Sequence, residues 1–376
     1  MPAHRPHLFV FGSSLTSSFW NGAATYYRGI YCQLDALGYR ITFAEPDIFG
    51  RQQHRDLAGD PPYATCAVYR SDTELESLLA QAACADVIIK HSGVGARDPF
   101  LEERVAELGQ AGPVCLYWDV DAPATLAELE ADAQHPLRRQ LSQFAAVLTY
   151  GGGPLLLKHY RSLGARQCHT IYNGLDPATH FPCRPDPAWS GDLLFMGHRL
   201  PDRDERVREY FLNVAERMPE MRMTLAGEGW QDLALPPNVR YFGHAPTAHH
   251  NRLNASARLV LNLNRDRMAA CGFSPPTRIF EAAGAGACVV TDAWPGIEQF
   301  FTPGEDIVVV ATPEELQYVL RTMSAEAARA MGARMRRRAL REHSYVQRAA
   351  QVDAVLRSLL HARFVNRPTA LHIREA

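Results

Sequence analysis

The sequence predicts an α/β protein built from two similar halves, each with a doubly wound parallel sheet. Short apolar runs that end in small or polar residues alternate with helix-like segments through both halves of the chain. The length of 376 residues is well above that of a usual domain of ~150 residues, so two domains are expected. A segment over 173–191, with an Asn-Gly turn and four prolines, separates the two series and suits a linker.

The first half contains apolar runs whose ends carry reactive or very small residues. The run over 8–11 leads through a Gly/Ser loop to a helix predicted over 22–37, and a strand over 40–43 follows. Three more strands are predicted, and they end in Lys90-His91, in Asp119-Val120-Asp121, and in Tyr150 followed by three glycines. Ligands of open parallel sheets bind beyond the carboxyl ends of the strands, so these endings are expected to carry the chemistry.

The second half repeats this alternation and ends in helices. Five strands are predicted, over 193–196, 222–226, 239–242, 259–263 and 287–291. Helices are predicted over 313–342 and 345–363, and the last dozen residues are expected to be loose. We therefore expect an N-terminal domain over 1–175, a proline-rich hinge over 176–191, a C-terminal domain over 192–344, and a closing helix and tail over 345–376.

Composition and charge exclude several classes of protein. With 39 basic and 41 acidic side chains the formal net charge is −2, which argues against a nucleic-acid partner. No apolar stretch approaches the ~18 residues of a membrane span. The first apolar run is too short for a signal peptide, and the eight cysteines form no Cys-x-x-Cys pair. We expect a cytoplasmic protein with at most peripheral membrane contact.

The cationic side chains are almost all arginines, because Lys90 and Lys158 are the only lysines. An anion held by side-chain charge is therefore expected to contact arginine. The loop that begins at Gly197 follows a predicted strand and opens a helix. Its Arg199 and Arg203 are the predicted partners of a diphosphate.

The loop after the first strand is rich in small residues and free backbone N–H groups. Such a loop before a helix suits a phosphate or a sugar oxygen, and its candidate residues are Gly12, Ser13, Ser14, Asn21 and Gly22. It matches neither a Walker loop nor a Gly-x-Gly-x-x-Gly pattern, so a nucleotide kinase or an NAD enzyme has no support. A plain tight connection is the alternative.

A second candidate binding segment lies over 275–290. Two prolines set a helix start at Thr277, and Arg278 and Glu281 share one face at i, i+3 spacing. A carboxylate there can accept hydrogen bonds from two vicinal hydroxyls, as on a ribose, while the helix start and the arginine face phosphates. An exposed i, i+3 salt bridge is the alternative.

Several motifs, taken in order, resemble family-4-type retaining glycosyltransferases (glycosyl transferases group 1) with the GT-B fold. Ile171-Tyr-Asn-Gly-Leu-Asp-Pro-Ala-Thr-His-Phe-Pro182 is similar to their hinge. The family's later motifs follow in order as Phe195-Met-Gly197, Gly227-Glu-Gly229, Asn238-Val-Arg-Tyr-Phe-Gly243 and Phe280-Glu-Ala-Ala-Gly-Ala-Gly-Ala-Cys-Val-Val-Thr-Asp292. The variants Gly-His-Arg-Leu-Pro-Asp-Arg and Ser-Pro-Pro-Thr-Arg-Ile-Phe-Glu resemble its CgeB-like (spore-maturation-type) branch. The resemblance covers about residues 8 to 350.

The resemblance implies two Rossmann-like domains that face a cleft, an N-terminal one for the acceptor and a C-terminal one for the nucleotide sugar. Glu281 matches the family's ribose-binding glutamate, whereas the family's sugar-facing glutamate falls on Phe273, so the backbone of 272–274 is the predicted substitute. The implied substrates are a UDP- or GDP-linked sugar and a hydroxyl of a glycan, lipid-linked or protein acceptor. The resemblance implies no cofactor.

The strand ends of the first half then supply candidates for catalysis. An inverting enzyme needs a general base, for which His91, Asp119 and Asp121 are candidates, whereas in a retaining enzyme they orient sugar hydroxyls. A hydrogen-bonded structural role is the alternative for His91. Lys90, Gly151 and Gly152 are predicted in the acceptor site or cleft, since three glycines in a row suit close approach of a ligand or of the other domain.

The sequence also bears on metal dependence and leaves two alternative functions open. Asp119-Val-Asp121 also matches the Asp-x-Asp pattern of metal-dependent glycosyltransferases, but so short a pattern often occurs by chance, so metal-independent transfer is expected. A non-catalytic nucleotide-sugar or glycan-binding protein is one alternative, because Phe273 replaces the sugar-facing glutamate. A nucleotide-sugar epimerase is the other.

Overall fold

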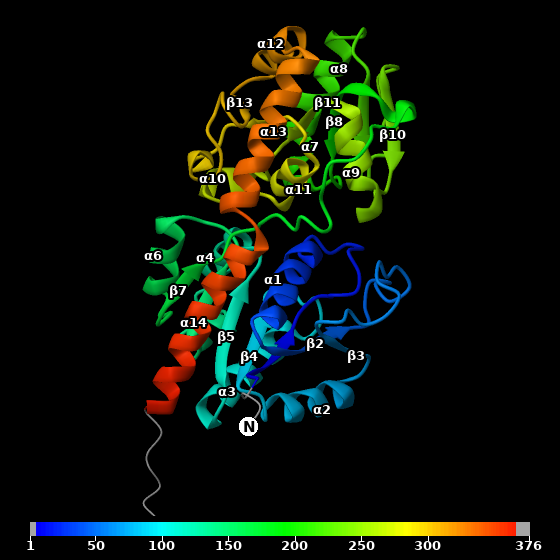
Figure 1. Ribbon diagram of the computed structural model, residues 1–376. Helices are drawn as coiled ribbons and strands as arrows, with labels where there is room; N and C mark the ends of the chain where they lie inside the picture. Colours follow the sequence, from blue (N-terminus) through cyan, green and yellow to red (C-terminus); the bar gives the residue numbers. More distant parts are fainter. Residues whose placement is uncertain (1–4, 366–376) are drawn as a thin grey trace, which may run out of the picture.

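Two parallel β-sheets, each flanked by helices, make up the computed structural model, which describes residues 5–365 (Figure 1). The first sheet has the strand order β3-β2-β1-β4-β5-β6-β7 and the second has the order β10-β9-β8-β11-β12-β13. All the strand pairs in both sheets are parallel. This confirms the predicted α/β fold with two Rossmann-like halves. The predicted loose tail lies beyond the described residues.

The N-terminal domain alternates strands and helices from the first strand onward. Its strands are β1 (His7–Phe11), β2 (Arg40–Pro46), β3 (Thr65–Tyr69), β4 (Val87–His91), β5 (Val114–Asp119), β6 (Ala146–Thr149) and β7 (Cys168–Thr170). Its helices are α1 (Ala24–Ala36), α2 (Asp72–Ala82), α3 (Asp98–Ala111), α4 (Ala122–Ala131), α5 (Pro136–Gln140) and α6 (Pro154–Ser162).

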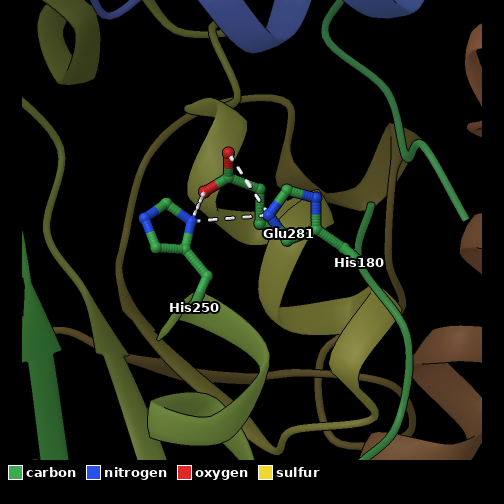
Figure 2. Close-up of side chains that lie close together, drawn as sticks. All are labelled: His180, His250 and Glu281. Atoms are coloured by element: carbon green, nitrogen blue, oxygen red, sulfur yellow. Dashed lines mark hydrogen bonds and ion pairs between the residues drawn. The ribbon is translucent and has the colours of Figure 1, made fainter. Parts of the chain in front are cut away.

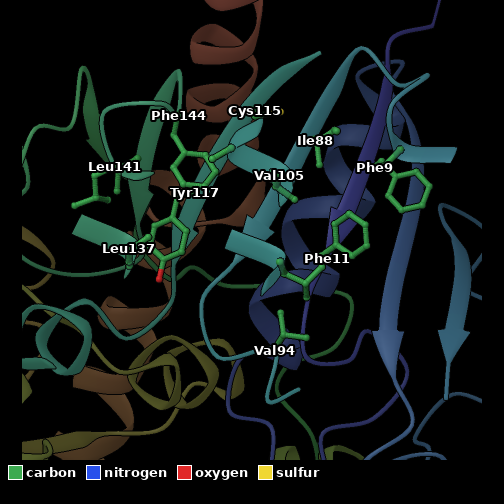
Figure 3. Packing of buried hydrophobic residues seen from close by; sticks show 14 of the residues in the cluster. Phe9, Phe11, Ile88, Val94, Val105, Cys115, Tyr117, Leu137, Leu141 and Phe144 are labelled. Atoms are coloured by element: carbon green, nitrogen blue, oxygen red, sulfur yellow. The ribbon is translucent and has the colours of Figure 1, made fainter. Parts of the chain in front are cut away.

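The first sheet is buried on both faces, which explains why its strands are continuous apolar runs. Along β1, Phe9 and Phe11 enter one hydrophobic core while Leu8 and Val10 enter the other. Figure 3 shows the first of these cores. Side chains point alternately to the two faces along a strand, so a sheet buried on both faces needs apolar residues in both alternating sets. In β1 both sets are apolar.

The C-terminal domain follows the same plan. Its strands are β8 (Gly191–Met196), β9 (Met223–Ala226), β10 (Val239–Gly243), β11 (Ala257–Asn262), β12 (Val289–Asp292) and β13 (Val308–Val310). Its helices are α7 (Pro201–Val207), α8 (Asn213–Arg217), α9 (Thr247–Ser256), α10 (Asp266–Cys271), α11 (Thr277–Ala285), α12 (Pro313–Thr322) and α13 (Ala325–Glu342). A π-helical turn over 208–212 joins α7 to α8.

Four features of the secondary structure differ from the prediction. The strands β3, β7 and β13 were not predicted; two of them have three residues, too few for a periodic signal, and β3 is only partly buried. The predicted helix over 313–342 is two helices. The chain breaks at Met323, and Ser324 starts α13 by accepting a hydrogen bond from the Ala327 N–H.

The chain crosses between the domains twice, at one place. After β7 it passes through the proline-rich segment to β8, and after α13 it returns as α14 (Tyr345–Val365), which lies along the N-terminal domain (Figure 1). The two crossings are joined by backbone hydrogen bonds from the Leu175 N–H to the His343 carbonyl (2.7 Å) and from the Tyr345 N–H to the Leu175 carbonyl (3.0 Å). The side chain of Tyr345 packs on Gly29 of α1. Of the helices described, none has both the length and the apolar character needed to cross a bilayer.

Candidate functional site

A cavity of about 510 Å³ lies between the two domains. Its wall consists of loops that follow β1, β4, β5 and β6 of the first sheet and β8 to β11 of the second, together with the first turns of α11. These are carboxyl ends of parallel strands, as predicted. Nine of the candidate residues line it: Ser13, Asn21, Gly22, Asp121, Gly197, Arg203, Thr277, Arg278 and Glu281.

The loop after β1 is held in shape by its own hydrogen bonds. The Ser13 hydroxyl donates to Asn21 Oδ1 (2.9 Å), and the Asn21 amide donates to the Ser14 carbonyl (2.7 Å). Gly12 lies beneath the loop, where a Cβ would meet the Phe43 ring at 2.3 Å. Within this loop, therefore, Ser13, Asn21 and Gly22 face the cavity, whereas Gly12 and Ser14 shape the backbone.

The guanidinium groups of the buried Arg203 and the partly buried Arg278 converge on Gly197 at the end of β8. A Cβ on this glycine would lie 2.8 Å from Arg203 Nη2 and 2.9 Å from Arg278 Nη2. Both guanidiniums also lie over the Phe195 ring, 5.5 and 5.8 Å from its centroid. Glycine is therefore required at position 197, because a Cβ there would crowd the two arginine side chains.

These two arginines retain unused hydrogen-bonding capacity. Arg203 donates from Nη2 to the His198 carbonyl (2.6 Å), but its Nε and Arg278 Nη1 find no partner among the described residues. Burial and the neighbouring Arg278 lower the pKa of Arg203 to about 9, and burial lowers the pKa of Arg278. Two cations held close together with free donors form a site for a polyanion.

Arg199, the other predicted diphosphate partner, lies outside the residues that line the cavity. Its Nε donates to Asp204 Oδ1 (2.6 Å), and its side chain is one-third exposed. The carboxylate of Asp204 thus already neutralises it. The structure brings Arg278, rather than Arg199, together with Arg203.

Glu281 lies one turn along α11 from Arg278 and faces two histidines (Figure 2). Its Oε1 lies 3.8 Å from His180 Nε2, and its Oε2 lies 3.7 Å from His250 Nδ1. Burial acts against the charged carboxylate, but His180, His250 and Arg278 together lower the pKa of Glu281 below its ordinary value. The group is therefore ionised at neutral pH and able to accept hydrogen bonds.

A ladder of aromatic rings closes one side of the cavity across the domain boundary. Trp20 of the N-terminal domain stacks on His198 of the C-terminal domain with ring centroids 5.4 Å apart, and His198 stacks on His244 at 6.2 Å. Trp20 has a left-handed backbone (φ 47°) and is 52% exposed. Trp230, a candidate for stacking on a base, is instead buried and donates to the Gly197 carbonyl.

The structure does not bring His91 to the cavity, which corrects its candidacy as a general base. Its side chain is fully buried, its Nε2 lies 2.6 Å from the Tyr31 hydroxyl, and its ring packs on Tyr27 and Trp118. Burial, with the nearby Lys90, lowers the pKa of His91 to about 3. His91 has the structural role that was its alternative.

We expect replacement of His91 by glutamine to reduce the acid sensitivity of the fold. Unfolded histidine takes up a proton near pH ~6.5, whereas folded His91 does so only near pH 3. Its contribution to stability is complete above pH ~6.5 and is lost as the pH falls toward the folded pKa, by up to ~1.4 kcal/mol per pH unit. Denaturant unfolding of both proteins between about pH 7 and about pH 4 measures this slope; parallel curves would contradict the assignment.

The surroundings of Asp119 likewise argue against a catalytic role for its carboxylate. Its carboxylate is buried and accepts hydrogen bonds from Tyr160, from the Ser92 hydroxyl (2.8 Å) and from the Asp121 N–H (2.8 Å). Burial raises the pKa of Asp119 despite these donors. Asp119 therefore fixes the turn after β5, and Asp119 and Asp121 do not present two free carboxylates to a metal.

Asp121 reaches the cavity but is paired across it. Arg265 of the C-terminal domain donates to Asp121 Oδ2 (2.8 Å) and to Asp202 Oδ2 (2.7 Å). Although burial acts against its charge, these two carboxylates raise the pKa of Arg265. The bridge joins the two domains at the wall of the cavity.

Lys90 does not reach the cavity either. Its ammonium group is fully buried and pairs with Asp98 (2.5 Å) and Glu102 (3.0 Å) on the α3 side of the first sheet. Burial raises the pKa of Glu102, and Lys90 acts against that rise. Lys90 therefore stabilises the fold instead of contacting an acceptor.

The glycines after β6 receive the loop that carries Phe273. The Gly152 N–H donates to the Phe273 carbonyl (2.8 Å), and a Cβ on Gly151 would lie 2.8 Å from Ser274 Oγ. Phe273 has a left-handed backbone (φ 49°), and its ring leaves no room for a Cβ on Gly153. The three glycines thus allow the other domain to approach, and 272–274 are not among the described residues that line the cavity.

Other residues that line the cavity were not predicted from the sequence. They include the cross-domain and histidine groups Trp20, Arg51, His198, His244, His250 and Arg265. No short motif marks them, since each gains its position from packing of distant segments. For His250, the adjacent pair His249-His250 on a polar helix is the one available signal.

Comparison of the sequence with known families gives one match. Residues 205–354 match the model of a family described as glycosyl transferase-like. This region begins in α7 and ends in α14. No curated protein matches the chain significantly.

Solved structures share the architecture over nearly the whole chain. HepE from Anabaena, in complex with UDP and glucose, aligns with a TM-score of 0.67 at 14% identity over 94% of this chain and 100% of its own. Sucrose-phosphate synthase from Thermosynechococcus elongatus gives 0.66 at 14% identity, over 96% and 100%. A glycosyltransferase involved in avilamycin A biosynthesis gives 0.60 at 17%, over 95% and 99%. At such identities the likeness shows the fold, and the predicted GT-B fold is confirmed.

Proposed function

We propose that this protein is a glycosyltransferase that moves a sugar from a nucleoside-diphosphate donor to a hydroxyl acceptor. One observation carries the proposal: Arg203 and Arg278, each with a free donor, converge at Gly197 in the same cavity as the ionised Glu281. A diphosphate beside a ribose presents this order of charges and hydroxyls. The glycosyl transferase-like match over 205–354, and neighbours solved with UDP or with UDP and glucose, support this choice of ligand.

In this proposal the C-terminal domain holds the nucleotide. Arg203 and Arg278 bind the diphosphate, and the N-terminus of α11 at Thr277 adds its positive end. Glu281 accepts from the ribose hydroxyls. The two arginines and the helix terminus stabilise the negative charge that develops on the departing nucleoside diphosphate, which is mainly electrostatic catalysis.

We further propose a retaining, metal-independent transfer, because neither carboxylate among the described residues that line the cavity is free to act as a general base toward an acceptor. Among the described residues that line it, the carboxylates are Asp121, paired with Arg265, and Glu281, on the nucleotide side. Transfer through a metal bridge would need a second carboxylate, and Asp119 is buried under three hydrogen bonds. The CgeB-like assignment and a hexose as the transferred sugar belong to this proposal.

In this proposal the acceptor lies against the N-terminal wall of the cavity near Tyr150, while Ser13, Asn21 and Gly22 of the loop after β1 close over the donor. The acceptor class is a hydroxyl of a glycan, a lipid-linked carrier or a protein. A cytoplasmic location is also proposed, and all eight cysteines are free, as expected in a reducing compartment.

A thermal-shift screen of UDP, GDP, ADP and dTDP tests the donor site. We expect one or two of them to raise the melting temperature, because a ligand at 100 times its Kd adds about 2.7 kcal/mol to the unfolding free energy. Glu281→Ala is expected to abolish the shift. If calorimetry finds that this variant binds the nucleoside diphosphate with unchanged affinity, the assignment of Glu281 to the ribose is wrong.

A non-catalytic nucleotide-sugar-binding protein is the second candidate. It is favoured by Phe273, which packs between Gly153 and Gly296 where the glycosyltransferases carry a sugar-facing glutamate. Release of UDP or GDP from a panel of sugar donors, with glycan acceptors present, separates the two. A product formed without any acceptor would instead indicate an epimerase.

A further inference from the structure

Three side chains of metal-ligating types meet beside the cavity, one turn along α11 from Arg278. They are His180 from the segment between the domains, His250 from α9 and Glu281 from α11 (Figure 2). Their ligand atoms all lie within 4.8 Å of one another. His180 is buried, and His250 and Glu281 line the cavity.

The two distances between the carboxylate and the imidazoles suit a shared cation better than direct hydrogen bonds. The carboxylate oxygens lie 3.7 and 3.8 Å from the imidazole nitrogens, which is too far for a hydrogen bond. His180 Nε2 and His250 Nδ1 lie 3.4 Å apart. Ligand atoms placed ~2.0–2.1 Å from one tetrahedral zinc ion are separated by about 3.3–3.4 Å, and the separations of 3.4 to 3.8 Å in this cluster lie close to that spacing.

The surroundings of His250 favour the ligating tautomer. Its Nε2 lies 3.1 Å from the Ala245 carbonyl, so that nitrogen carries the proton and Nδ1 turns a lone pair toward the cluster. A backbone carbonyl behind an imidazole is one of the common outer partners of a zinc-bound histidine. The outer nitrogen of His180, Nδ1, is buried and lacks a hydrogen-bond partner in the described part of the chain.

Each oxygen of Glu281 faces a different imidazole, Oε1 toward His180 and Oε2 toward His250. A cation between the three groups therefore engages both oxygens. Under the proposed function these same oxygens accept from the ribose hydroxyls. Metal and ribose cannot both use them.

We propose that His180, His250 and Glu281 form a zinc site whose occupancy blocks the ribose position, so that zinc inhibits nucleotide binding. Two imidazoles and one carboxylate are a ligand set that zinc favours. The metal takes no part in the transfer itself. The competition rests on the proposed function, whereas the metal site stands on the cluster alone.

The first measurement is made without nucleotide. Zinc is titrated against a chromophoric zinc indicator with the full chain, and bound equivalents are compared for wild type, His250→Gln, His180→Gln and His249→Gln. His249 is exposed on the same helix, outside the cluster, and is the matched control. We expect each cluster variant to lose one tight equivalent and His249→Gln to keep it. Circular dichroism identifies any variant that fails to fold, in which case the other cluster variant decides.

The second measurement is the affinity for UDP with and without zinc. We expect saturating zinc to weaken UDP binding at least tenfold in wild type and in His249→Gln, and a chelator to restore it. In His250→Gln zinc is expected to have little effect, which separates competition at the cluster from complexation of UDP in solution.

Retention of the tight zinc equivalent in both cluster variants, or equal zinc inhibition in His250→Gln and His249→Gln, overturns the inference. If zinc binds in one cluster-dependent equivalent but no nucleoside diphosphate binds, the proposed function fails and the metal site stands.

Discussion

Replacing Arg278 by methionine is expected to lower the affinity for the nucleoside diphosphate by about 10- to 150-fold. Hydrogen bonds to a charged partner contribute roughly 1.5–3 kcal/mol each, and the free Nη1 of this arginine is available to a phosphate. Isothermal titration calorimetry measures the loss. Circular dichroism without ligand checks that the variant folds.

Arg199→Met is the matched control for this prediction. Arg199 is the same residue type on a neighbouring loop, but it is neutralised by Asp204 and does not line the cavity. We expect its affinity for the diphosphate to stay within about twofold of wild type. Loss of binding in Arg199→Met with normal binding in Arg278→Met would reverse the assignment that the structure makes.

Replacing Lys90 by methionine is expected to cost about 3–5 kcal/mol of unfolding free energy at neutral pH, because it leaves the buried Glu102 without its cation. Burial already raises the pKa of Glu102, and removal of Lys90 raises it further. A carboxyl group whose pKa is higher in the folded than in the unfolded protein stabilises the fold at pH values below its unfolded pKa. This contribution is lost as the pH rises. The deficit is therefore expected to shrink in mild acid.

The double variant Lys90→Met/Glu102→Leu separates structure from catalysis. Exchange of a buried ion pair for apolar side chains is often close to neutral, so most of the lost stability should return. Denaturant unfolding of the three proteins at two pH values makes the measurement. Normal stability of Lys90→Met together with lost transfer activity would restore Lys90 to the acceptor site.

Most of the fold was predictable because its signals are local. Continuous apolar runs with a small residue at the end identified ten strands near their observed positions, and the prolines over 177–187 marked the segment between the domains. The strands that escaped are short or half-buried, and the break at Met323 depends on one capping serine. No periodic pattern extends over so few residues.

The candidate site was predictable only in part. The scarcity of lysine indicated arginine as the anion ligand, and the helix start at Thr277 indicated Glu281. Glu281 lines the cavity, and so do the arginines Arg203 and Arg278. The strand-end rule failed for Lys90, His91 and Asp119, because a residue at the end of a strand points to one of two faces or into the turn, and here all three side chains turn into buried structure.

By itself, then, the sequence determined the two-domain architecture, the edge of each sheet where ligands bind and the type of charge that holds them. The tertiary structure decided which arginines meet at Gly197, and it brought His180, His250 and Glu281 together. The physical reason is the separation along the chain over which each kind of signal acts. Strand and helix patterns depend on neighbours a few residues away, whereas the direction and charge environment of a side chain depend on segments that meet only when the two domains pack.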